Sequence, residues 1–366
     1  MASRRAQSAE KADMSSKITV SVDAMGNDRG IATIIDGCAR ALKYHPELSF
    51  ILHGDGPAIK AELRSHSELE AVTTVEHADV AVSMEDKPSQ ALRKGRYKSS
   101  MWKAVQSVKD GDAHFAVSAG NTGALMAMSK FCLRMMEGVD RPVIACIWPT
   151  LRGESVVLDV GANVGANGEQ LATMGVLGAA MARALLPVRK PTVGLLNIGE
   201  EEVKGQDNVQ EGARLMRAWD LPNLQYHGFV EGDDIGKGTT DVVVTEGFAG
   251  NIALKTAEGT ARQIGQTLSE AMRSSFMSKI GAVFARGAFS HLRQKLDPRR
   301  SNGGVFLGLN GIVIKSHGGT DGTGFAHAIE IGADMAANDL NGRIQRNVAR
   351  IAGMLDEDAS TDEAVQ

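Results

Sequence analysis

The chain has 366 residues, of which 43% are hydrophobic and 23% charged, the proportions of a soluble globular protein with room for one large α/β domain or two smaller ones. A formal net charge of −4 gives no overall reason to expect a nucleic-acid partner. No run of the sequence approaches the roughly 18 apolar residues that a membrane span needs, so no membrane-spanning helix is predicted.

The ends of the chain and its cysteines indicate the compartment. Residues 1–16 lack the apolar core of a secretion signal and are predicted to be a flexible leader. Residues 356–366 are acidic and poor in apolar side chains, so we expect a disordered tail. The three cysteines, Cys38, Cys132 and Cys146, have no CxxC spacing and are expected to be small core residues of a reduced, cytoplasmic protein.

A unit of apolar run, glycine-rich loop and helical pattern repeats along the chain. The runs that indicate strands are 18–22, 49–53, 114–117, 156–160, 192–197, 226–230, 241–245 and 311–315. Strands that alternate with helices form βαβ units, so the predicted fold class is α/β, with a mainly parallel sheet flanked by helices. We expect one α/β/α catalytic unit over residues 17–355, with its ligand outside the carboxyl ends of the strands.

Four of the loops pair glycine with asparagine, serine or threonine: SAGNTG, DVGANVG, EGFAGN and KSHGGTDG. Any one of them is explained by the tight turn that an α/β protein needs at this point. Together they offer many backbone N–H donors and few fixed charges, which suits an anionic, oxygen-rich ligand. None reads GxxxxGK[ST], and no GxGxxG opens the first helix, so neither a P-loop nor a dinucleotide site has its usual signal.

The stretch 241–258 is the most informative of these turns. Its β-branched run is followed by two glycines around Phe248-Ala249, and Asn251 is expected to cap the helix that follows. Lys255 then lies near the start of that helix, where a cation opposes the helix dipole. It is either a solvated lysine or the partner of an anion that the free N–H groups of the helix start hold.

Two further lysines and one histidine lie in similar loops. Lys204 follows three consecutive glutamates, and Lys315 ends an apolar run just before His317. A lysine at the mouth of a strand is a plausible phosphate contact, although Lys204 also has the glutamates at 200–202 as simple ion-pair partners. His317 is either an acid–base group or a hydrogen-bonded structural residue. The sequence has no HExxH motif and no Cys/His cluster, so no metal site is predicted.

Residues 261–300 depart from the α/β rhythm and predict a helical protrusion. Apolar residues recur there at steps of three and four, namely Phe276, Ile280, Val283, Phe284 and Leu292, and basic residues flank this stripe. Such a basic amphipathic helix is typical of a segment that binds a membrane surface or a partner. Alternatively, the stripe packs on a second subunit or a neighbouring helix, and in a dimer both could hold.

As a set, these motifs resemble one known family. In order along about 17–352, DAMGND, SAGNTGALMA, LDVGANV, NIGEEEVKGQD, DVVVTEGFAGNIALKTAEG and LGLNGIVIKSHG closely resemble motifs of the bacterial phosphate acyltransferases of phospholipid synthesis. The resemblance implies a Rossmann-like fold of the isocitrate/isopropylmalate dehydrogenase group. It also implies transfer of a long-chain acyl group from acyl carrier protein to inorganic phosphate, with no cofactor and no metal.

The same resemblance implies where the protein works and with which partners. It implies a cytoplasmic homodimer that associates peripherally with the inner face of the membrane through its helical protrusion. A glycerol 3-phosphate acyltransferase is expected to consume the acyl phosphate. No nucleic acid is expected as a partner.

Carried over motif by motif, the resemblance implies that the catalytic residues are Lys204 and Asn251. Substrate-binding positions are expected at Asp23, Asn121, Thr122, Asn163, Gly250, Lys255, Lys315 and His317. Membrane contact is expected at Phe276, Ile280, Val283 and Phe284. The chain departs from the family pattern in its first and fourth loops, at Asn27, Ile31 and Gly165-Ala166.

Two other classes of function are compatible with the sequence. One is a phosphotransacetylase-like enzyme that uses an acyl-CoA and would need a nucleotide-binding surface. The other is a non-catalytic membrane-docking protein that has kept the fold, which the departures at Asn27 and Gly165-Ala166 make worth testing.

Overall fold

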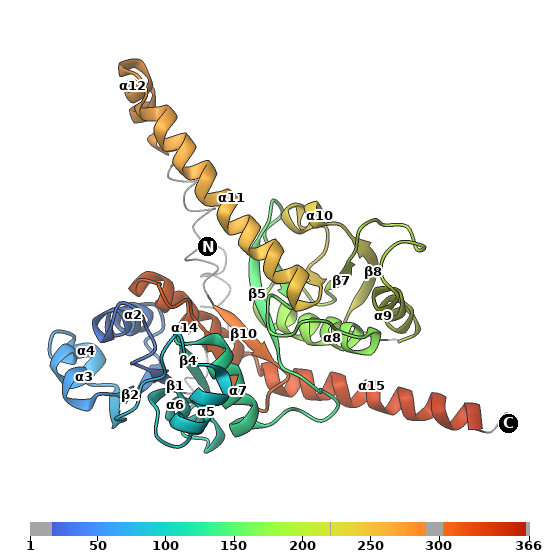
Figure 1. Ribbon diagram of the computed structural model, residues 1–366, viewed down its shortest axis with the longest axis horizontal. Helices are drawn as coiled ribbons and strands as arrows, with labels where there is room; N and C mark the ends of the chain where they lie inside the picture. The colour runs from blue at the N-terminus through green and yellow to red at the C-terminus, as the bar shows by residue number, and fades with distance from the viewer. Residues whose placement is uncertain (1–16, 220, 288, 290–302, 364–366) are drawn as a thin grey trace.

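The computed structural model describes residues 17–219, 221–287, 289 and 303–363, and it forms two lobes joined by one sheet (Figure 1). Across these residues the sheet has 11 strands in the order β3-β2-β1-β4-β11-β10-β5-β6-β9-β7-β8. In Figure 1 the blue and teal lobe holds β1–β4 and the green and yellow lobe holds β5–β9, while β10 returns late in the chain between them. The expected leader lies outside the described residues.

Most neighbouring strands are parallel. The strands are β1 (Ile18–Asp23), β2 (Leu48–Gly54), β3 (Thr73–His77), β4 (Phe115–Ser118), β5 (Val143–Pro149), β6 (Glu154–Leu158), β7 (Thr192–Leu196), β8 (Gln225–Val230), β9 (Val242–Val244), β10 (Gly304–Leu307) and β11 (Ile312–Lys315). The antiparallel pairs of the described sheet are those of β10 with β5 and β11, and of β5 with β6. The predicted α/β class with a mainly parallel sheet is therefore confirmed.

Three strands of the structure, β3, β5 and β10, were not predicted from the sequence. β3 lies at the edge of the sheet and has a single large apolar residue, Val75. β10 has only four residues, of which the first is a glycine, and another glycine precedes it. β5 pairs antiparallel with β6, so it stands outside the repeated strand–helix unit on which the prediction depends.

Helices cover both faces of the sheet. They are α2 (Ile31–Tyr44), α3 (Gly56–Leu63), α4 (Ser67–Glu70), α5 (Pro88–Gly95), α6 (Ser100–Lys109), α7 (Thr122–Leu133), α8 (Gly168–Leu185), α9 (Asp207–Ala218), α10 (Gly232–Lys237), α11 (Gly247–Arg273), α12 (Phe276–Phe284), α14 (Gly322–Ala337) and α15 (Leu340–Glu363). In β6, Val156 and Leu158 join the core cluster that includes α2, α8 and α14, whereas Val157 joins the cluster of α6 and α7. Burial of this kind on both faces is typical of parallel sheets.

The helix α11 leaves the body of the molecule, and α12 continues outward (Figure 1). The described part of the expected protrusion is helical apart from short turns such as the one at Ser274-Ser275, and the rest of it, including Leu292, lies outside the described residues. None of the described helices combines the length and the apolarity that a membrane crossing requires.

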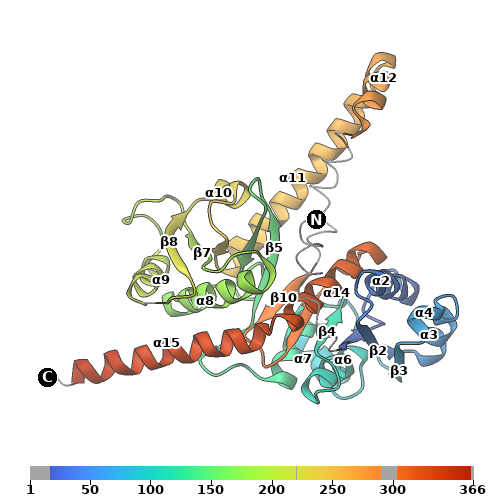
Figure 2. The same ribbon diagram turned by 180° about the vertical axis from the view of Figure 1, so that it is seen from behind.

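The last helix corrects one expectation. Residues 356–363 belong to α15, where the sequence predicts a disordered acidic tail, and 364–366 lie outside the described residues. The helix starts on the buried side chains Leu340, Ile344 and Val348 and packs against α8, and it then projects from the body (Figure 2). Once a helix is nucleated by packing, each added residue costs little, so the acidic segment continues it.

Candidate active site

One switch point of the sheet lies between β1 and β4. From β1 the chain continues to β2 and β3 on one side, whereas β4 lies on the other side. A ligand crevice is expected at the carboxyl ends of such a strand pair. Asp23 at the end of β1 is in register with Ser118 of β4, and Ser118 is in register with Lys315 of β11. The fold therefore sets these three residues side by side at one edge of the sheet.

The carboxylate of Asp23 is buried and engaged within the chain. Its Oδ2 accepts a hydrogen bond from Ser118 Oγ at 2.7 Å, and its Oδ1 accepts one from the Met25 N–H at 3.2 Å. Burial raises the pKa of Asp23, while these hydrogen bonds and the charge of Lys315 lower it. Asp23 therefore supports the two loops at the switch point. A direct contact with substrate stays a prediction.

Lys315 is almost buried at the same edge. Its Nζ donates to the carbonyl oxygens of Ala119, at 3.4 Å, and of Ser316, which uses two of its three N–H groups. Burial lowers the pKa of Lys315 to about 8, with Asp28 and Asp23 acting to raise it. A lysine that is desolvated in this way gains charge stabilisation from an anion.

Lys255 and His317 complete a cluster with Lys315, which we call the lysine–histidine cluster (Lys255, Lys315, His317). Burial lowers the pKa of His317, and the charges of Lys315 and Lys255 lower it further, while Glu258 raises it. Lys255 Nζ lies 3.0 Å from Glu258 Oε2. Lys255 and Glu258 belong to α11, whereas Lys315 ends β11 and His317 lies in the loop after it, so the cluster joins the two lobes. Three predicted substrate-binding residues thus come together.

The start of α11 corrects the expected role of Asn251. The helix begins at Gly247, and its N-cap is Glu246, whose carboxylate accepts from the N–H groups of Phe248 at 3.0 Å and Ala249 at 2.7 Å. Burial acts to raise the pKa of Glu246, but its hydrogen bonds to backbone N–H groups outweigh burial and lower it. Asn251 therefore lies beyond the cap, within the helix.

No free N–H group remains in the first turn of this helix to hold an anion. Besides the two N–H groups bound by Glu246, that of Gly247 donates to the carbonyl of Asn163 at 2.8 Å, and that of Gly250 donates to the carbonyl of Glu246 at 3.0 Å. The first turn of α11 therefore lacks the free N–H groups that an anion at the helix start would need, and an anion at Lys255 would have to rely on side chains. Gly250, a predicted substrate-binding residue at this helix start, allows close packing: a Cβ at this position would overlap the carbonyl oxygen of Asp159.

The side chain of Asn251 faces the end of β6. Its Nδ2 donates to the carbonyl of Val160 at 3.3 Å, and a Cβ at Gly161 would lie 2.7 Å from that nitrogen. Gly161 has φ 129°, a conformation that favours glycine. The loop and the helix thus fit against each other around the Asn251 amide.

Asp159 holds the loop that follows β6. Its Oδ1 accepts from the N–H groups of Gly161 at 3.0 Å and Ala162 at 2.8 Å, and its Oδ2 accepts from the N–H of Asn163 at 2.9 Å. Asn163 Nδ2 also donates to this carboxylate and to the carbonyl of Pro142, both at 2.8 Å. Burial raises the pKa of Asp159. The amide of Asn163 therefore fixes the loop, and its role in substrate binding stays a prediction.

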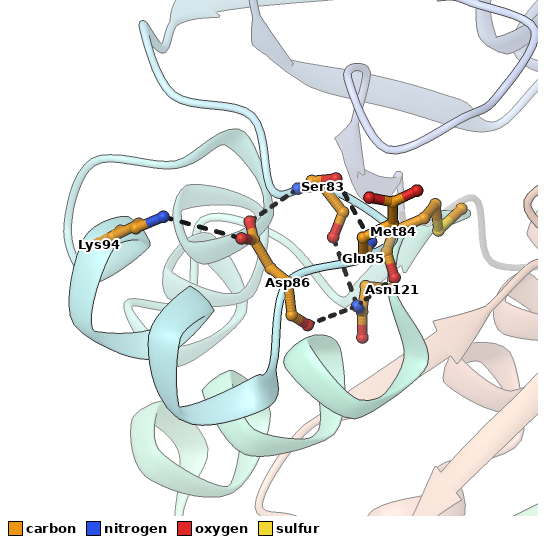
Figure 3. A network of polar contacts seen from close by, with 6 residues as sticks. All are labelled: Ser83, Met84, Glu85, Asp86, Lys94 and Asn121. Atoms are coloured by element: carbon orange, nitrogen blue, oxygen red, sulfur yellow. Dashed lines mark hydrogen bonds and ion pairs between the residues drawn. The ribbon is translucent and has the colours of Figure 1, made fainter.

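The side chain of Asn121 is likewise hydrogen-bonded to other groups of the chain. Its Nδ2 donates to the carbonyls of Ser83 at 3.3 Å, Met84 at 2.8 Å and Asp86 at 2.9 Å (Figure 3), and its Oδ1 caps α7. Figure 3 shows Asn121 beneath the turn at 83–86, with Lys94 reaching Asp86 from α5 at 3.9 Å. The geometry favours a positioning role for Asn121.

Thr122 is the first residue of α7, and it is exposed. The Asn121 side chain caps this helix, so Thr122 lies at its N-terminus beside the loop that follows β4. Its role in substrate binding stays a prediction.

Lys204 lies in the exposed loop after β7. Its Nζ forms an ion pair with Glu201 Oε2 at 2.8 Å, and the hydrogen bond to Glu201 raises the pKa of Lys204. The polar partners of its side chain among the described residues are this glutamate and, at longer range, Glu231. The structure does not bring Lys204 into contact with Asn251 or the lysine–histidine cluster, and its catalytic role stays a prediction.

The first loop carries one of the departures from the expected pattern. Asn27 Oδ1 accepts from the N–H of Arg29 at 2.6 Å, whereas its Nδ2 is buried without a partner among the described residues. A buried amide donor that lacks a partner is costly. The neighbouring Asp28 acts on both Lys315 and His317, so this donor lies next to residues that interact with the cluster.

A pocket of about 140 Å³ lies beside the loop after β6. The loop residues Asn163 and Gly165 line it together with Arg141, Val143, Met174 and Leu177. Gly165 has φ 75°, where glycine is favoured, and its N–H donates to Glu246 Oε2 at 3.0 Å. Across the described residues, no group of three His, Cys, Asp or Glu side chains is placed to hold a metal ion.

The arm carries a second candidate surface. Phe276, Ile280 and Phe284 of α12 are exposed, as is the neighbouring Met277. The side chain of Val283 lies outside the described part of the structure. Large apolar side chains that are grouped and exposed mark interaction surfaces.

Sequence reasoning missed Glu246, Glu258 and Asp28. A sequence signal exists for one of them: Glu258 lies three residues after Lys255, the spacing of a helical ion pair. Asp28 carries no such signal, because only the fold brings it near Lys315 and His317.

Known proteins resemble this chain over most of its length. A family model described as "Fatty acid synthesis protein" matches residues 18–343. A protein of Afipia carboxidovorans named "Phosphate acyltransferase" is 57% identical over 96% of this chain and 100% of its own length. One of Rhodopseudomonas palustris with the same name is 58% identical over 92% of this chain and 97% of its own.

A solved structure shares the fold. A phosphotransacetylase from Streptococcus pyogenes superposes with a TM-score of 0.62 at 17% identity, over 92% of this chain and 99% of its own. At that identity the likeness shows the fold alone, and it supports the predicted α/β class.

Proposed function

The chain belongs to the phosphate acyltransferase family of fatty acid and phospholipid synthesis, and from this membership we propose that it forms an acyl phosphate from a long-chain acyl-carrier-protein thioester and inorganic phosphate. The lysine–histidine cluster is the observation that carries this proposal. It sets two ammonium groups and an imidazole at the carboxyl edge of the sheet, where ligands of α/β proteins bind. Phosphate is a compact anion that suits such a cluster.

Phosphate attacks the thioester directly in the proposed reaction. One of its oxygens forms a bond to the carbonyl carbon, the C–S bond breaks, and the carrier leaves as a thiolate that takes up a proton. No covalent enzyme intermediate is required. Holding phosphate beside the carbonyl contributes about 7–11 kcal/mol in well-oriented reactions, and Lys255 and Lys315 are proposed to hold it.

The carbonyl oxygen needs a donor as charge develops on it. Asn251 is proposed for this role because its amide lies one helical turn before Lys255 and meets the end of β6. A well-placed donor of this kind lowers the barrier by ~2.7–4 kcal/mol. The N–H groups near Gly250 are engaged in the helix and are not part of the proposal. Asn27 offers a further donor at the rim of the site.

Lys204 is proposed to reach phosphate by exchanging its ion pair. An exposed pair such as Lys204–Glu201 contributes little to stability, so an incoming dianion can replace the glutamate at little cost. The exposed loop after β7 would then close on the bound phosphate. This step would bring Lys204, which lies away from the cluster, into contact with the phosphate.

The proposed setting is a homodimer in the cytoplasm that docks on the inner face of the membrane. The exposed apolar side chains of α12 support this docking surface. The proposed product, an acyl phosphate, is then consumed by a glycerol 3-phosphate acyltransferase. The expected single catalytic unit over 17–355 is supported by the sheet that runs through both lobes.

The experiment is phosphate-dependent release of the carrier thiol from palmitoyl-acyl carrier protein by the purified protein, with no added metal. We expect release by the wild type and its collapse in Lys204→Ala, with the thermal unfolding temperature unchanged. Full activity of the variant would remove Lys204 from the mechanism. Release from acetyl-CoA but not from the carrier thioester would favour a phosphotransacetylase-like enzyme instead.

A further inference from the structure

Exposed apolar side chains surround the asparagine proposed to bind the carbonyl oxygen. Phe248 and Ile252 of α11 are 60% and 50% exposed, and Val164 in the loop after β6 is 83% exposed. Phe248 lies three residues before Asn251 and four before Ile252, so all three side chains share one side of the helix. These apolar groups offer nothing to phosphate. They suit a different part of the substrate.

Glu246 ties the loop of Val164 to this side of α11. Its Oε2 accepts from the N–H groups of both Phe248 and Gly165, each at 3.0 Å. The carbonyl of Asn163 accepts from the N–H of Gly247 at 2.8 Å. The peptide groups on both sides of Val164 are thus bound to the first turn of the helix. We call Val164, Phe248 and Ile252 the apolar patch.

The same loop also borders a cavity. Asn163 and Gly165, the neighbours of Val164 in sequence, line the pocket of about 140 Å³. Val139, Val143, Met174 and Leu177 supply its apolar lining. An apolar chain that crosses the patch at Val164 therefore has a partly apolar pocket beside it.

We infer that the apolar patch and this pocket bind the hydrocarbon chain of the acyl substrate. The inference rests on the proposed function, because a carbonyl held at Asn251 fixes where the chain begins. From that point Phe248 and Ile252 are the first apolar side chains available on the helix, and Val164 and the pocket follow. Each buried methylene favours binding about fourfold, so a long acyl chain gains more from this track than a short one.

Two other occupants of the apolar patch, a second copy of this chain and a membrane, would have different effects on the kinetics. A second copy of this chain would bury the patch in a dimer, and a membrane would bury it together with the arm. Neither would make the effect of the patch depend on the length of the acyl chain. Chain-length dependence in the absence of membranes is therefore the property that distinguishes the acyl chain from both.

The test compares palmitoyl- and hexanoyl-acyl carrier protein in the thiol-release assay, without vesicles. In the double variant Phe248→Ser/Ile252→Ser we expect kcat/KM for the palmitoyl substrate to fall at least about tenfold, the loss of roughly two methylene contacts. For the hexanoyl substrate we expect a smaller loss, because its short chain reaches only the apolar side chains nearest Asn251 and gains less from the track as a whole. Leu151→Ser is the matched control, because Leu151 is 79% exposed in the turn between β5 and β6, at the opposite edge of the sheet.

Thr173→Phe tests the pocket separately. Thr173 lines it from α8 and is partly exposed, so a larger side chain there fills the pocket from its rim. We expect this variant to lower kcat/KM for palmitoyl more than for hexanoyl substrate while leaving the thermal unfolding temperature near that of the wild type. An unchanged chain-length preference would remove the pocket from the inference.

Other outcomes overturn the inference in recognisable ways. Equal losses for both chain lengths in the double variant would show that the patch positions the reacting groups. A lower sedimentation coefficient would show that the patch covers a second copy, and weaker binding to phosphatidylglycerol vesicles with unchanged kinetics would show a membrane contact. A wild type that releases no thiol from either substrate would overturn the proposed function itself.

Discussion

The helix α11 passes through two different surroundings. At its base, a Cβ at Gly247 would overlap the backbone of Asn163, and one at Gly250 would overlap the carbonyl of Asp159. Farther along the same helix, a Cβ at Gly259 or Gly265 would meet nothing within 4 Å. One continuous helix thus leads from a close-packed region into an open one.

This difference separates two kinds of function on one element. At the base, contacts with the loop after β6 determine where Asn251 and Lys255 lie relative to the sheet. On the arm, no comparable contact with the described body of the protein sets the position of a side chain, so the exposed apolar residues are available to a partner. We therefore expect substitutions at the base to change geometry and turnover, and substitutions on the arm to leave turnover unchanged.

Gly250→Ala has the largest expected effect. The added methyl group would overlap backbone, which cannot move as a side chain can, so we expect the free energy of unfolding to fall by about 3 kcal/mol or more. The displaced helix would also misplace Asn251, so turnover should fall in the protein that remains folded. Chemical denaturation and thiol release from one preparation measure both effects.

Gly259→Ala is the matched substitution on the same helix. Here the methyl group meets nothing, and replacing glycine by alanine in a helix interior stabilises it by roughly 0.5–1 kcal/mol. We expect a higher free energy of unfolding and unchanged thiol release. If Gly259→Ala destabilised the protein as much as Gly250→Ala, the arm would be packed in solution and the two halves of the helix would not differ.

Two cations near Glu258 sharpen the comparison. Lys255 lies 3.0 Å from this carboxylate on the side of the base, and Arg262 lies 3.9 Å from it toward the arm. We expect Lys255→Met to lower kcat/KM for phosphate roughly 10- to 100-fold, because charge-assisted hydrogen bonds are worth ~1.5–3 kcal/mol. Arg262→Met should change it less than about twofold. Equal losses in both variants would mean that general positive charge, and not the cluster, attracts phosphate.

The pKa of Lys315 predicts how phosphate binding depends on pH. Burial and the charge of Lys255 together lower this pKa to about 8, and Asp28 and Asp23 oppose the change. His317, whose pKa is also lowered, is already neutral in this range. We expect KM for phosphate to rise about tenfold per pH unit above pH 8, as the ammonium loses its proton. Lys315→Arg keeps its charge and should show a flat profile.

The same group links stability to pH. Because the folded pKa of about 8 lies below the usual 10.5, the unfolded chain binds more protons between these values. The free energy of unfolding is therefore expected to rise from pH 8 to 10.5 in the wild type, and this contribution should be missing in Lys315→Arg. A wild type whose stability is insensitive to pH over this window would contradict a buried lysine.

The fold class and part of the site follow from the sequence for a physical reason. Glycine-rich loops come directly after apolar runs, and a parallel sheet gathers the ends of such runs at one edge. Lys255, Lys315 and His317 could therefore be placed in one region. Asp28 could not, because nothing local marks a carboxylate that meets a distant lysine only after folding.

The error at the start of α11 has a local cause. Asn251 is a preferred N-cap residue and precedes Ile252, Ala253 and Leu254, whereas glutamate is not a preferred cap and Glu246 precedes a glycine, so the local pattern favours Asn251. The choice is made by tertiary contacts: Gly247 and Gly250 must pack on the loop after β6, which requires the helix to begin early. Glu246 then binds two N–H groups of the helix and one of that loop. A pattern in one segment does not contain this information.

Polar substitutions on the arm have the smallest expected effect on the fold and the clearest effect on a partner. Phe276, Ile280 and Phe284 are exposed, so replacing all three by serine should change the free energy of unfolding by less than about 0.5 kcal/mol per site. Thiol release from a carrier thioester in solution should be unchanged as well.

Binding to anionic vesicles, measured by sedimentation with the vesicles, is expected to be lost, because apolar side chains supply the burial that holds an amphipathic helix at the interface. Tyr44→Ser, which alters an exposed apolar residue of the other lobe, should leave that binding intact. If the triple variant kept its vesicle binding but changed its sedimentation coefficient, the arm would bind a second subunit. The arm would then be exposed in the single chain but covered in the dimer.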